Sequence, residues 1–306
     1  MADRSTNVVY AALAGNVMVA MSKFTAASIS GSSAMLTEAI HSSADTANQI
    51  LLLIGNSRSR AAPDDSHAFG YDGEVYFWAF VVAVVVLVAG GAASLYEGMR
   101  KLTHPEPLTS PWLSLGVLAL SVVFEGSSLW FGLKEYRRVA YRHRLPGFKV
   151  SLWRFIELSK DPNLYETLLE DLAALAGIGI AASGIIASAI FDLLWADGAA
   201  SLGIGLLLIA DSWVIARATR SLVAGETVAP PLLKDLKCAL EGSPQVRAFV
   251  DLKTLHLGPR SILVTVTVEL TAGTIASGAA ARDLDQVSEQ LKAVDPRVSY
   301  VFFRLR

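Results

Sequence analysis

The sequence predicts a polytopic α-helical membrane protein that ends in a small α+β domain. Of the 306 residues, 53% are hydrophobic and only 18% are charged, whereas soluble globular domains contain about 25% charged residues. Six apolar stretches are each long enough to cross a bilayer, which takes about 20 residues of helix. After Gly225 these stretches give way to shorter runs. We therefore expect a six-helix transmembrane domain over residues 1–225 and a second domain over 226–306.

The six predicted spans follow one another with short connections. They cover approximately Val8–Ile29, Ser33–Gly55, Val75–Tyr96, Pro111–Leu133, Leu164–Ile190 and Leu194–Ala216. The third span is the most apolar, and ionisable residues interrupt the second. The first has neither the basic segment nor the small-residue cleavage site of a signal peptide, so we expect it to be retained as a helix.

The distribution of Lys and Arg predicts the orientation of the spans, because these residues concentrate in cytoplasmic loops. Only Arg100 and Lys101 lie between the third and fourth spans, whereas Arg58 and Arg60 follow the second, and Arg217 and Arg220 follow the sixth. The connection between the fourth and fifth spans carries Lys134, Arg137, Arg138, Arg142, Arg144, Lys149, Arg154 and Lys160. Both termini are therefore expected on the cytoplasmic or an equivalent side. Since no organelle transit peptide is evident, a prokaryotic inner membrane is favoured.

The segment after Gly225 has the pattern of a small mixed domain. Pro230 and Pro231 mark a break, and the turn Gly258-Pro259-Arg260 is typical of a hairpin. The predicted elements are a helix over Leu232–Leu240, strands over Arg247–Leu257 and Ser261–Leu270, a helix over Ala281–Val294 and a strand over Val298–Leu305. The order α-β-β-α-β predicts a two-layer α+β domain.

Composition also excludes several classes of function. The net charge of −2 gives no basic excess for binding nucleic acid. The single cysteine, Cys238, excludes a disulfide framework and a cysteine-rich zinc site.

The second span carries the strongest chemical signal. Glu38, His41 and Asp45 stand at positions i, i+3 and i+7, so they share one narrow stripe of a helix. Ionisable residues inside a span are costly and are functional candidates. Imidazole and carboxylate groups are ligands that zinc accepts. The stripe therefore predicts a metal site facing the bundle interior; the alternative is a set of hydrogen-bonded polar partners or the lining of a water cavity.

The fifth span supplies a second group of acids near its start. We expect Asp171 to face the same site as the second span, and leave open whether Glu170 does. For Glu166 we expect no more than a favourable interaction with the helix dipole.

These motifs resemble those of the cation diffusion facilitators, a family of transporters for zinc and related metals. The stretch Ser30–Asp45 resembles the family's second-span signature, and Pro63–Tyr71 matches its Pro-Asp-x-x-His-Pro-Phe-Gly loop. The stretches Ser159–Pro162 and Leu168–Asp171 resemble the branch that includes an animal mitochondrial zinc transporter. The resemblance covers nearly the whole chain.

The resemblance implies a homodimer with six spans and a cytoplasmic ferredoxin-like tail, which exchanges a divalent metal for protons by alternating access. It also implies a transport site made of two residue pairs at i, i+4. In this sequence the pairs are His41 with Asp45 and Thr167 with Asp171.

Thr167 departs from the family pattern, since a threonine hydroxyl is a poor zinc ligand. Glu170, Glu38 or a water would have to complete the shell, and an oxygen-rich site also suits Mn²⁺ or Fe²⁺. The tail departs as well: it offers only His256, which we expect to be a surface or packing residue in a dimerisation domain without bound metal. In the loop, Asp64, Asp65 and His67 form either a peripheral ion site or a solvated polar loop.

The resulting hypothesis is an antiporter that exports a divalent metal, zinc first and Mn²⁺, Fe²⁺ or Co²⁺ otherwise, and is not an enzyme. The metal ligands would be His41, Asp45, Asp171 and Glu170. Two further intramembrane acids, Glu125 and Asp211, are given no ligand role; they would line a water path or pair with Lys23. The alternatives are a non-transporting scaffold or partner subunit, and an intramembrane metalloenzyme, for which no His-Glu-x-x-His motif is present.

Overall fold

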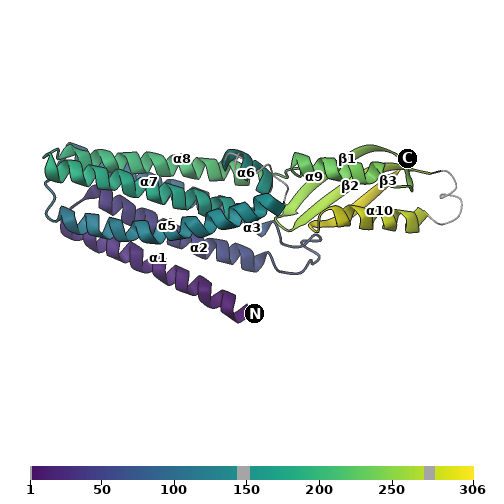
Figure 1. The fold of residues 1–306 in the computed structure, drawn as a ribbon, viewed down its shortest axis with the longest axis horizontal. Helices are drawn as coiled ribbons and strands as arrows, with labels where there is room; N and C mark the ends of the chain where they lie inside the picture. The colour runs from purple at the N-terminus through teal and green to yellow at the C-terminus, as the bar shows by residue number, and fades with distance from the viewer. Residues whose placement is uncertain (1, 143–151, 272–279) are drawn as a thin grey trace. The chain divides into compact units, whose positions relative to one another are not determined.

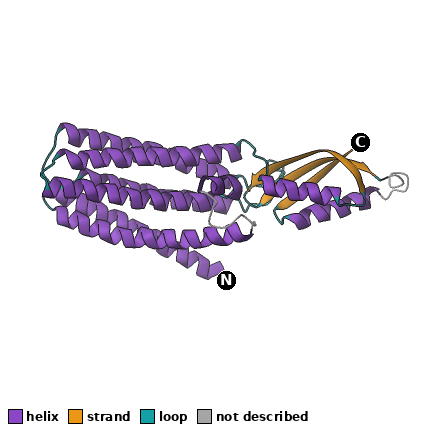
Figure 2. Ribbon diagram, turned by 45° about the horizontal axis from the view of Figure 1, so that its top comes forward, coloured by secondary structure: helices purple, strands orange, loops and turns teal. Residues whose placement is uncertain are grey.

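The computed structural model describes residues 2–142, 152–271 and 280–306 (Figures 1 and 2). Its long helices are α1 (Ala2–Ser30), α2 (Ser33–Arg58), α5 (Pro111–Arg142), α7 (Pro162–Ile190) and α8 (Trp195–Val223). A further long helix consists of α3 (Glu74–Val85), a π-helical turn (Val86–Ala92) and α4 (Ala93–Thr103). The short helix α6 (Leu152–Ser159) precedes α7. Of the predicted basic connection, Arg144 and Lys149 lie outside the described residues.

Within the described part of the chain, four helices are long and apolar enough to cross a membrane. They are Glu74–Thr103, Pro111–Arg138, Pro162–Ile190 and Trp195–Val223. The first two predicted spans correspond to α1 and α2. Over its described residues α2 does not meet the same test, and its stripe of Glu38, His41 and Asp45 is a physical reason for lower hydropathy. Four of the six predicted spans are therefore confirmed as candidate spans.

The chain divides into two compact units. One comprises Met1–Ile54, Trp78–Val150 and Asn163–Arg217, and the other Gly55–Phe77, Ser151–Pro162 and Ala218–Arg306. The predicted boundary at 225/226 stays a prediction.

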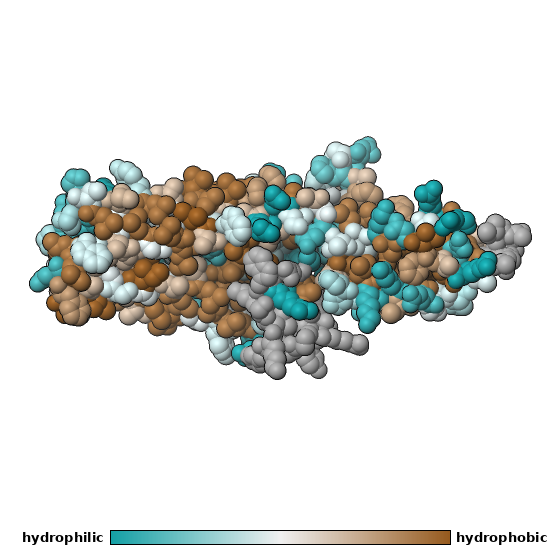
Figure 3. Space-filling model, turned by 90° about the horizontal axis from the view of Figure 1, so that it is seen from above, coloured by the Kyte–Doolittle hydropathy of each residue, from teal (hydrophilic) through white to brown (hydrophobic). Residues whose placement is uncertain are grey.

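Large apolar side chains cover the outside of the helical unit. Figure 3 shows apolar residues over its helices. Exposed examples are Val123, Trp130, Phe131, Leu206 and Trp213. A contiguous apolar surface of this kind is costly in water and favourable in lipid.

Small residues bring the helices of this unit close together. A Cβ atom placed on Gly98 of α4 would lie 2.7 Å from the backbone nitrogen of Leu202 in α8. Conversely, a Cβ on Gly205 of α8 would lie 3.1 Å from the backbone nitrogen of Leu95. Close backbone approach through small residues is the usual way in which helices pack inside a membrane.

The start of α2 is fixed by a buried carboxylate from α8. Asp197 is fully buried and accepts hydrogen bonds from the Ser33 backbone N–H at 2.7 Å, from Ser33 Oγ at 2.9 Å and from Ser32 Oγ at 2.5 Å. The first N–H groups of a helix have no partner within the helix, and a negative charge there also favours the helix dipole. Asp197 therefore anchors the helix that carries the predicted metal site.

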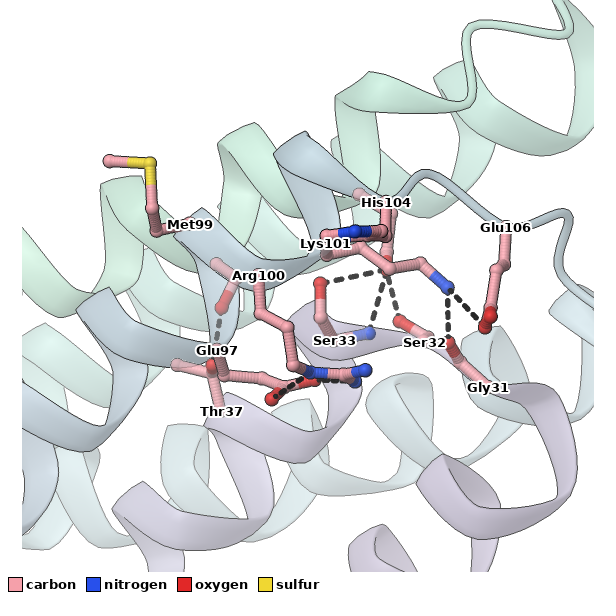
Figure 4. A network of polar contacts seen from close by, with 12 residues as sticks. Gly31, Ser32, Ser33, Thr37, Glu97, Met99, Arg100, Lys101, His104 and Glu106 are labelled. Atoms are coloured by element: carbon pink, nitrogen blue, oxygen red, sulfur yellow. Dashed lines mark hydrogen bonds and ion pairs between the residues drawn. The ribbon is translucent and has the colours of Figure 1, made fainter.

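A buried lysine supports the same corner of the helical unit. Figure 4 shows Lys101 of α4 beside Gly31, Ser32 and Ser33. Its ammonium donates a hydrogen bond to the Gly31 carbonyl at 2.9 Å and lies 4.0 Å from Glu106 Oε2. The bend between α1 and α2 is thus held from two neighbouring helices.

The second unit contains a three-stranded sheet with two helices, in the predicted order α-β-β-α-β. The helices are α9 (Pro230–Glu241) and α10 (Ala280–Val294), and the strands are β1 (Val246–Gly258), β2 (Ser261–Leu270) and β3 (Val298–Leu305). Strand β2 is central, antiparallel to β1 and parallel to β3. Every second residue of β2 from Ile262 to Leu270 is buried, as expected for a strand with one face on the core.

The β1–β2 hairpin is fastened to the loop that follows α2. The guanidinium of Arg260 donates two hydrogen bonds to Asp72 Oδ1, at 3.0 and 2.7 Å, and one to Ser59 Oγ at 3.0 Å. The Arg260 backbone N–H donates to Asp72 Oδ2 at 2.9 Å. The predicted turn residue therefore also joins distant segments of this unit.

Replacing Asp197 by alanine should destabilise the helical unit, because the N-terminal N–H groups of α2 and two buried serine hydroxyls lose their acceptor. We expect a loss of about 2–3 kcal/mol, measured as a lower unfolding midpoint of the purified chain in detergent. Asp197→Asn, which keeps one acceptor oxygen, should lose less. Equal midpoints for the wild type and Asp197→Ala would contradict the anchoring role.

Candidate functional site

The stripe predicted on α2 is present, but its three members have different surroundings. Glu38 and His41 are buried, whereas the Asp45 side chain keeps 15% of its surface exposed. His41 Nδ1 lies 3.4 Å from Asp45 Oδ1. Neither His41 nitrogen has a hydrogen-bond partner among the described residues. His41 and Asp45 are therefore adjacent and available to an ion, as the i, i+4 spacing predicts.

Glu38 is already engaged by a buried lysine from α1. The Lys23 ammonium lies 3.0 Å from Glu38 Oε2 and donates to Ser42 Oγ at 2.7 Å, and both Lys23 and Glu38 are fully buried. This pairing makes Glu38 a poor candidate for the metal shell. Among the described residues, Glu38 rather than Glu125 or Asp211 is the ion-pair partner of Lys23.

The acids of α7 also separate into different environments. Asp171 is 7% exposed, and its Oδ2 is buried without a hydrogen-bond partner in the described part of the chain. Glu170 Oε1 accepts a hydrogen bond from Asn48 Nδ2 of α2 at 2.5 Å. The Thr167 hydroxyl donates to the Asn163 carbonyl at 2.8 Å. Asp171 is therefore the least encumbered ligand candidate on α7.

Glu166 has a different setting from the one expected. It lies beyond the first turn of α7 and is fully buried, and neither carboxylate oxygen has a hydrogen-bond partner among the described residues. A favourable interaction with the helix dipole falls off within the first turn, so it does not account for this residue.

A cavity of about 570 Å³ is lined from both α2 and α7. We call the candidate ligands of these two helices the two half-sites. Asp45 of α2 and Thr167, Glu170 and Asp171 of α7 all lie on its wall. The remaining lining residues are Gly15, Asn16, Val19, Ser42, Gln49, Leu52, Phe124, Glu125, Ser127, Ser128, Phe131 and Gly132. His41 is not among the lining residues. The wall thus contains four carboxylates and several hydroxyl and amide groups, which suit a cation.

In the part of the chain that the structure describes, no three His, Cys, Asp or Glu side chains stand together at metal-binding geometry. The candidate ligands share a cavity but are not preassembled around one point.

The loop candidates are mostly engaged with one another. Asp64 Oδ1 accepts from Ser66 Oγ at 2.7 Å, and Asp64 Oδ2 accepts from Tyr71 OH at 2.7 Å. These hydrogen bonds keep the pKa of Asp64 below its usual range. His67 Nδ1 lies 3.9 Å from Asp64 Oδ1. The loop is therefore held by its own polar contacts, whether or not it also binds an ion.

His256 is a packing residue of the sheet rather than a surface one. It is 4% exposed, its backbone N–H donates to the Glu226 carbonyl at 3.0 Å, and Nδ1 is buried without a hydrogen-bond partner in the described residues. Burial, followed by the charge of Arg297, lowers the pKa of His256 to about 4. The imidazole is therefore neutral at physiological pH.

The long apolar helices and the cavity between them, whose wall carries four carboxylates, are the features of a multi-pass membrane protein with an acidic interior. Residues 9–223 match the signature of the cation efflux transmembrane domain. The chain therefore belongs to the cation efflux family, which confirms the resemblance to cation diffusion facilitators. This family consists of transporters rather than enzymes, in agreement with the prediction and against the metalloenzyme alternative.

Similar proteins have been named in several organisms. The chain is 34% identical over 289 residues to the Homo sapiens protein named proton-coupled zinc antiporter SLC30A9, mitochondrial, covering 94% of this chain and 50% of that protein. It is 29% identical over 259 residues to metal tolerance protein C4 of Arabidopsis thaliana, covering 85% of this chain and 56% of that protein. The chain thus spans about half the length of these relatives.

His256 predicts how the stability of the second unit depends on pH. Its folded pKa is about 4, below that of an unfolded histidine, so the unfolded chain binds more protons between these values and stability falls as pH falls. From about pH 7.5 to about pH 5 we expect a loss of about 2 kcal/mol from this residue.

The test compares thermal unfolding of the full chain at these two pH values for the wild type and His256→Gln. The variant should lose this part of the pH dependence. The same pH dependence in both proteins would show that His256 does not cause it.

Proposed function

We propose that this protein exports a divalent metal cation, zinc in the first place, in exchange for protons by alternating access. The observation that carries the proposal is the cavity between α1, α2, α5 and α7, whose wall includes the carboxylates of Asp45 and Asp171. Two relatives add support, because one is named a proton-coupled zinc antiporter and the other a metal tolerance protein. Mn²⁺, Fe²⁺ and Co²⁺ are further candidate cargoes.

The proposed ligands are His41 and Asp45 from α2 and Asp171 and Glu170 from α7. Asp45, Glu170 and Asp171 already line the cavity. His41 lies next to Asp45, 3.4 Å from its Oδ1, so a side-chain rotation is needed to bring its ring to the ion. Glu170 must exchange its hydrogen bond from Asn48 for the metal. The ion would draw these groups together as it enters.

Competition between metal and protons provides the coupling. A histidine or carboxylic acid must lose its proton before it binds a metal. Metal binding therefore releases protons, and a proton arriving at the same groups favours metal release. Since one set of residues serves both ions, a proton gradient can drive metal across the membrane when the cavity opens to alternate sides.

The same proposal includes the finer architecture predicted above. It has six spans, with α1 and α2 as the first two, a transmembrane domain at 1–225 and a ferredoxin-like domain at 226–306 that supports a homodimer. The order β1-β2-β3 with its parallel β2–β3 pair supports this fold, and the Lys and Arg distribution supports cytoplasmic termini. Location in a prokaryotic inner membrane stays a prediction, because related proteins include mitochondrial and bacterial ones.

One observation favours a second candidate, a family member that does not transport and acts as a scaffold or partner subunit. Thr167 occupies a position where a stronger ligand is expected, and its hydroxyl is committed to the Asn163 carbonyl. Metal flux separates the two functions.

The function is tested by zinc flux into proteoliposomes under an imposed pH gradient, with the wild type beside Asp45→Ala. The wild type should show gradient-dependent flux, and loss of one ligand should slow it at least about tenfold, since disturbing even the supports of ligands weakens metal sites about 10–100-fold. Gradient-dependent flux that survives in the variant would keep the transporter and reject this site. No flux of Zn²⁺, Mn²⁺, Fe²⁺ or Co²⁺ by the wild type would favour the scaffold.

A further inference from the structure

The proposed transport site lacks a metal ligand at Thr167. The Thr167 hydroxyl donates a hydrogen bond to the Asn163 carbonyl of its own helix, at 2.8 Å. Glu170 is held by Asn48, and Glu38 by Lys23. Zinc in proteins is almost always surrounded by at least four donor groups. If Glu170 keeps its hydrogen bond from Asn48, then His41, Asp45 and Asp171 supply only three donors, so the fourth donor is either another oxygen on the cavity wall or a water.

Glu125 of α5 is placed to fill this gap. It lies on the wall of the same cavity as Asp45 and Asp171. In the part of the chain that the structure describes, its carboxylate makes no hydrogen bond or ion pair. Asp211, the other intramembrane acid, is not part of the cavity wall. Glu125 is thus a carboxylate on the cavity wall that belongs to neither half-site.

The face of α5 that carries Glu125 is the face that meets α7. Glu125, Ser128 and Gly132 stand at i, i+3 and i+7, so they share one stripe of the helix, and all three line the cavity. A Cβ atom on Gly132 would lie 3.0 Å from Leu168 Cδ2 and 3.9 Å from Asp171 Oδ2. The absence of a side chain at Gly132 therefore lets α5 approach α7 beside the ligand candidate Asp171.

The charge of Glu125 also acts on both half-sites. It is among the electrostatic neighbours of His41 and Asp45 on α2 and of Asp171 on α7. The Lys23 ammonium also acts electrostatically on Glu125, but it is ion-paired to Glu38. A divalent ion in the cavity would neutralise charges that the chain itself leaves without a dedicated partner.

We propose that Glu125 is a metal-binding residue, contributed by α5, which takes the part in the transport site that Thr167 does not fill. This inference rests on the proposed function and deepens it. It makes the shell one of imidazole and at least three carboxylates from α2, α5 and α7. Such a shell is richer in oxygen than a histidine-rich site and so admits harder divalent ions such as Mn²⁺ beside Zn²⁺.

The test uses the full chain, with Zn²⁺ binding in detergent and Zn²⁺ flux in proteoliposomes measured side by side. Glu125→Gln keeps the size of the side chain and removes its charge. We expect at least about tenfold weaker Zn²⁺ binding and a matching loss of flux. The matched control is Glu135→Gln, an exposed acid on the same helix that pairs with Arg138 at 2.8 Å; it should leave both unchanged.

A second variant separates a ligand from a merely structural residue. Thr167 lines the cavity, so Thr167→Asp in the Glu125→Gln background returns a carboxylate to the wall from α7. Restored Zn²⁺ affinity and flux support the proposal. Unchanged behaviour of Glu125→Gln, or a loss that Thr167→Asp does not restore, overturns it. If the wild type itself neither binds nor moves Zn²⁺, the proposed function fails instead.

Discussion

The structure depends on carboxylates that are buried inside a helical membrane unit without a cation of their own. Asp45 Oδ1 and Asp171 Oδ2 are buried and lack hydrogen-bond partners among the described residues. The lysine that shares this interior, Lys23, is ion-paired to Glu38. Burying an unpaired charge costs several kcal/mol, so these groups must bind either protons or a metal ion. The alternation between the two is the proposed transport chemistry.

The rest of the helical unit keeps these groups in place while leaving the cavity open. Asp197 fixes the start of α2, the helix of His41 and Asp45, through its first backbone N–H groups. Glycines such as Gly98 and Gly205 let α4 and α8 pack backbone against backbone. These close contacts make the bundle compact, while the polar cavity remains open between α1, α2, α5 and α7.

Much of the fold could be predicted because its signals are local. Strands β2 and β3 have the predicted bounds, because the alternation of apolar residues and the hairpin turn can be recognised from neighbouring residues in the sequence. The π-helical turn Val86–Ala92 and the short helix α6 were not predicted. An apolar run looks the same for α- and π-helix, and the eight residues of α6 are fewer than the window of about 11–18 residues over which helical periodicity is recognised.

The candidate site was predicted less completely, because its decisive contacts join distant segments. The spacing of His41 and Asp45 was sufficient to place them together. The ion pair of Glu38 with Lys23 and the hydrogen bond of Glu170 with Asn48 each join two different helices. The spacing of residues within one helix therefore does not predict them. Glu125 did leave a signal, as an acid inside a span, but only the cavity shows that it lies on the same wall as Asp45 and Asp171.

The central claim, that one set of residues binds metal and protons in turn, is tested most directly by counting protons released when Zn²⁺ binds. Calorimetry of the purified chain in two buffers of different ionisation enthalpy gives this number. The account predicts release of at least about one proton per Zn²⁺ bound near about pH 7, with affinity that weakens as pH falls. Zn²⁺ binding that releases no protons and has the same affinity across this pH range would contradict it.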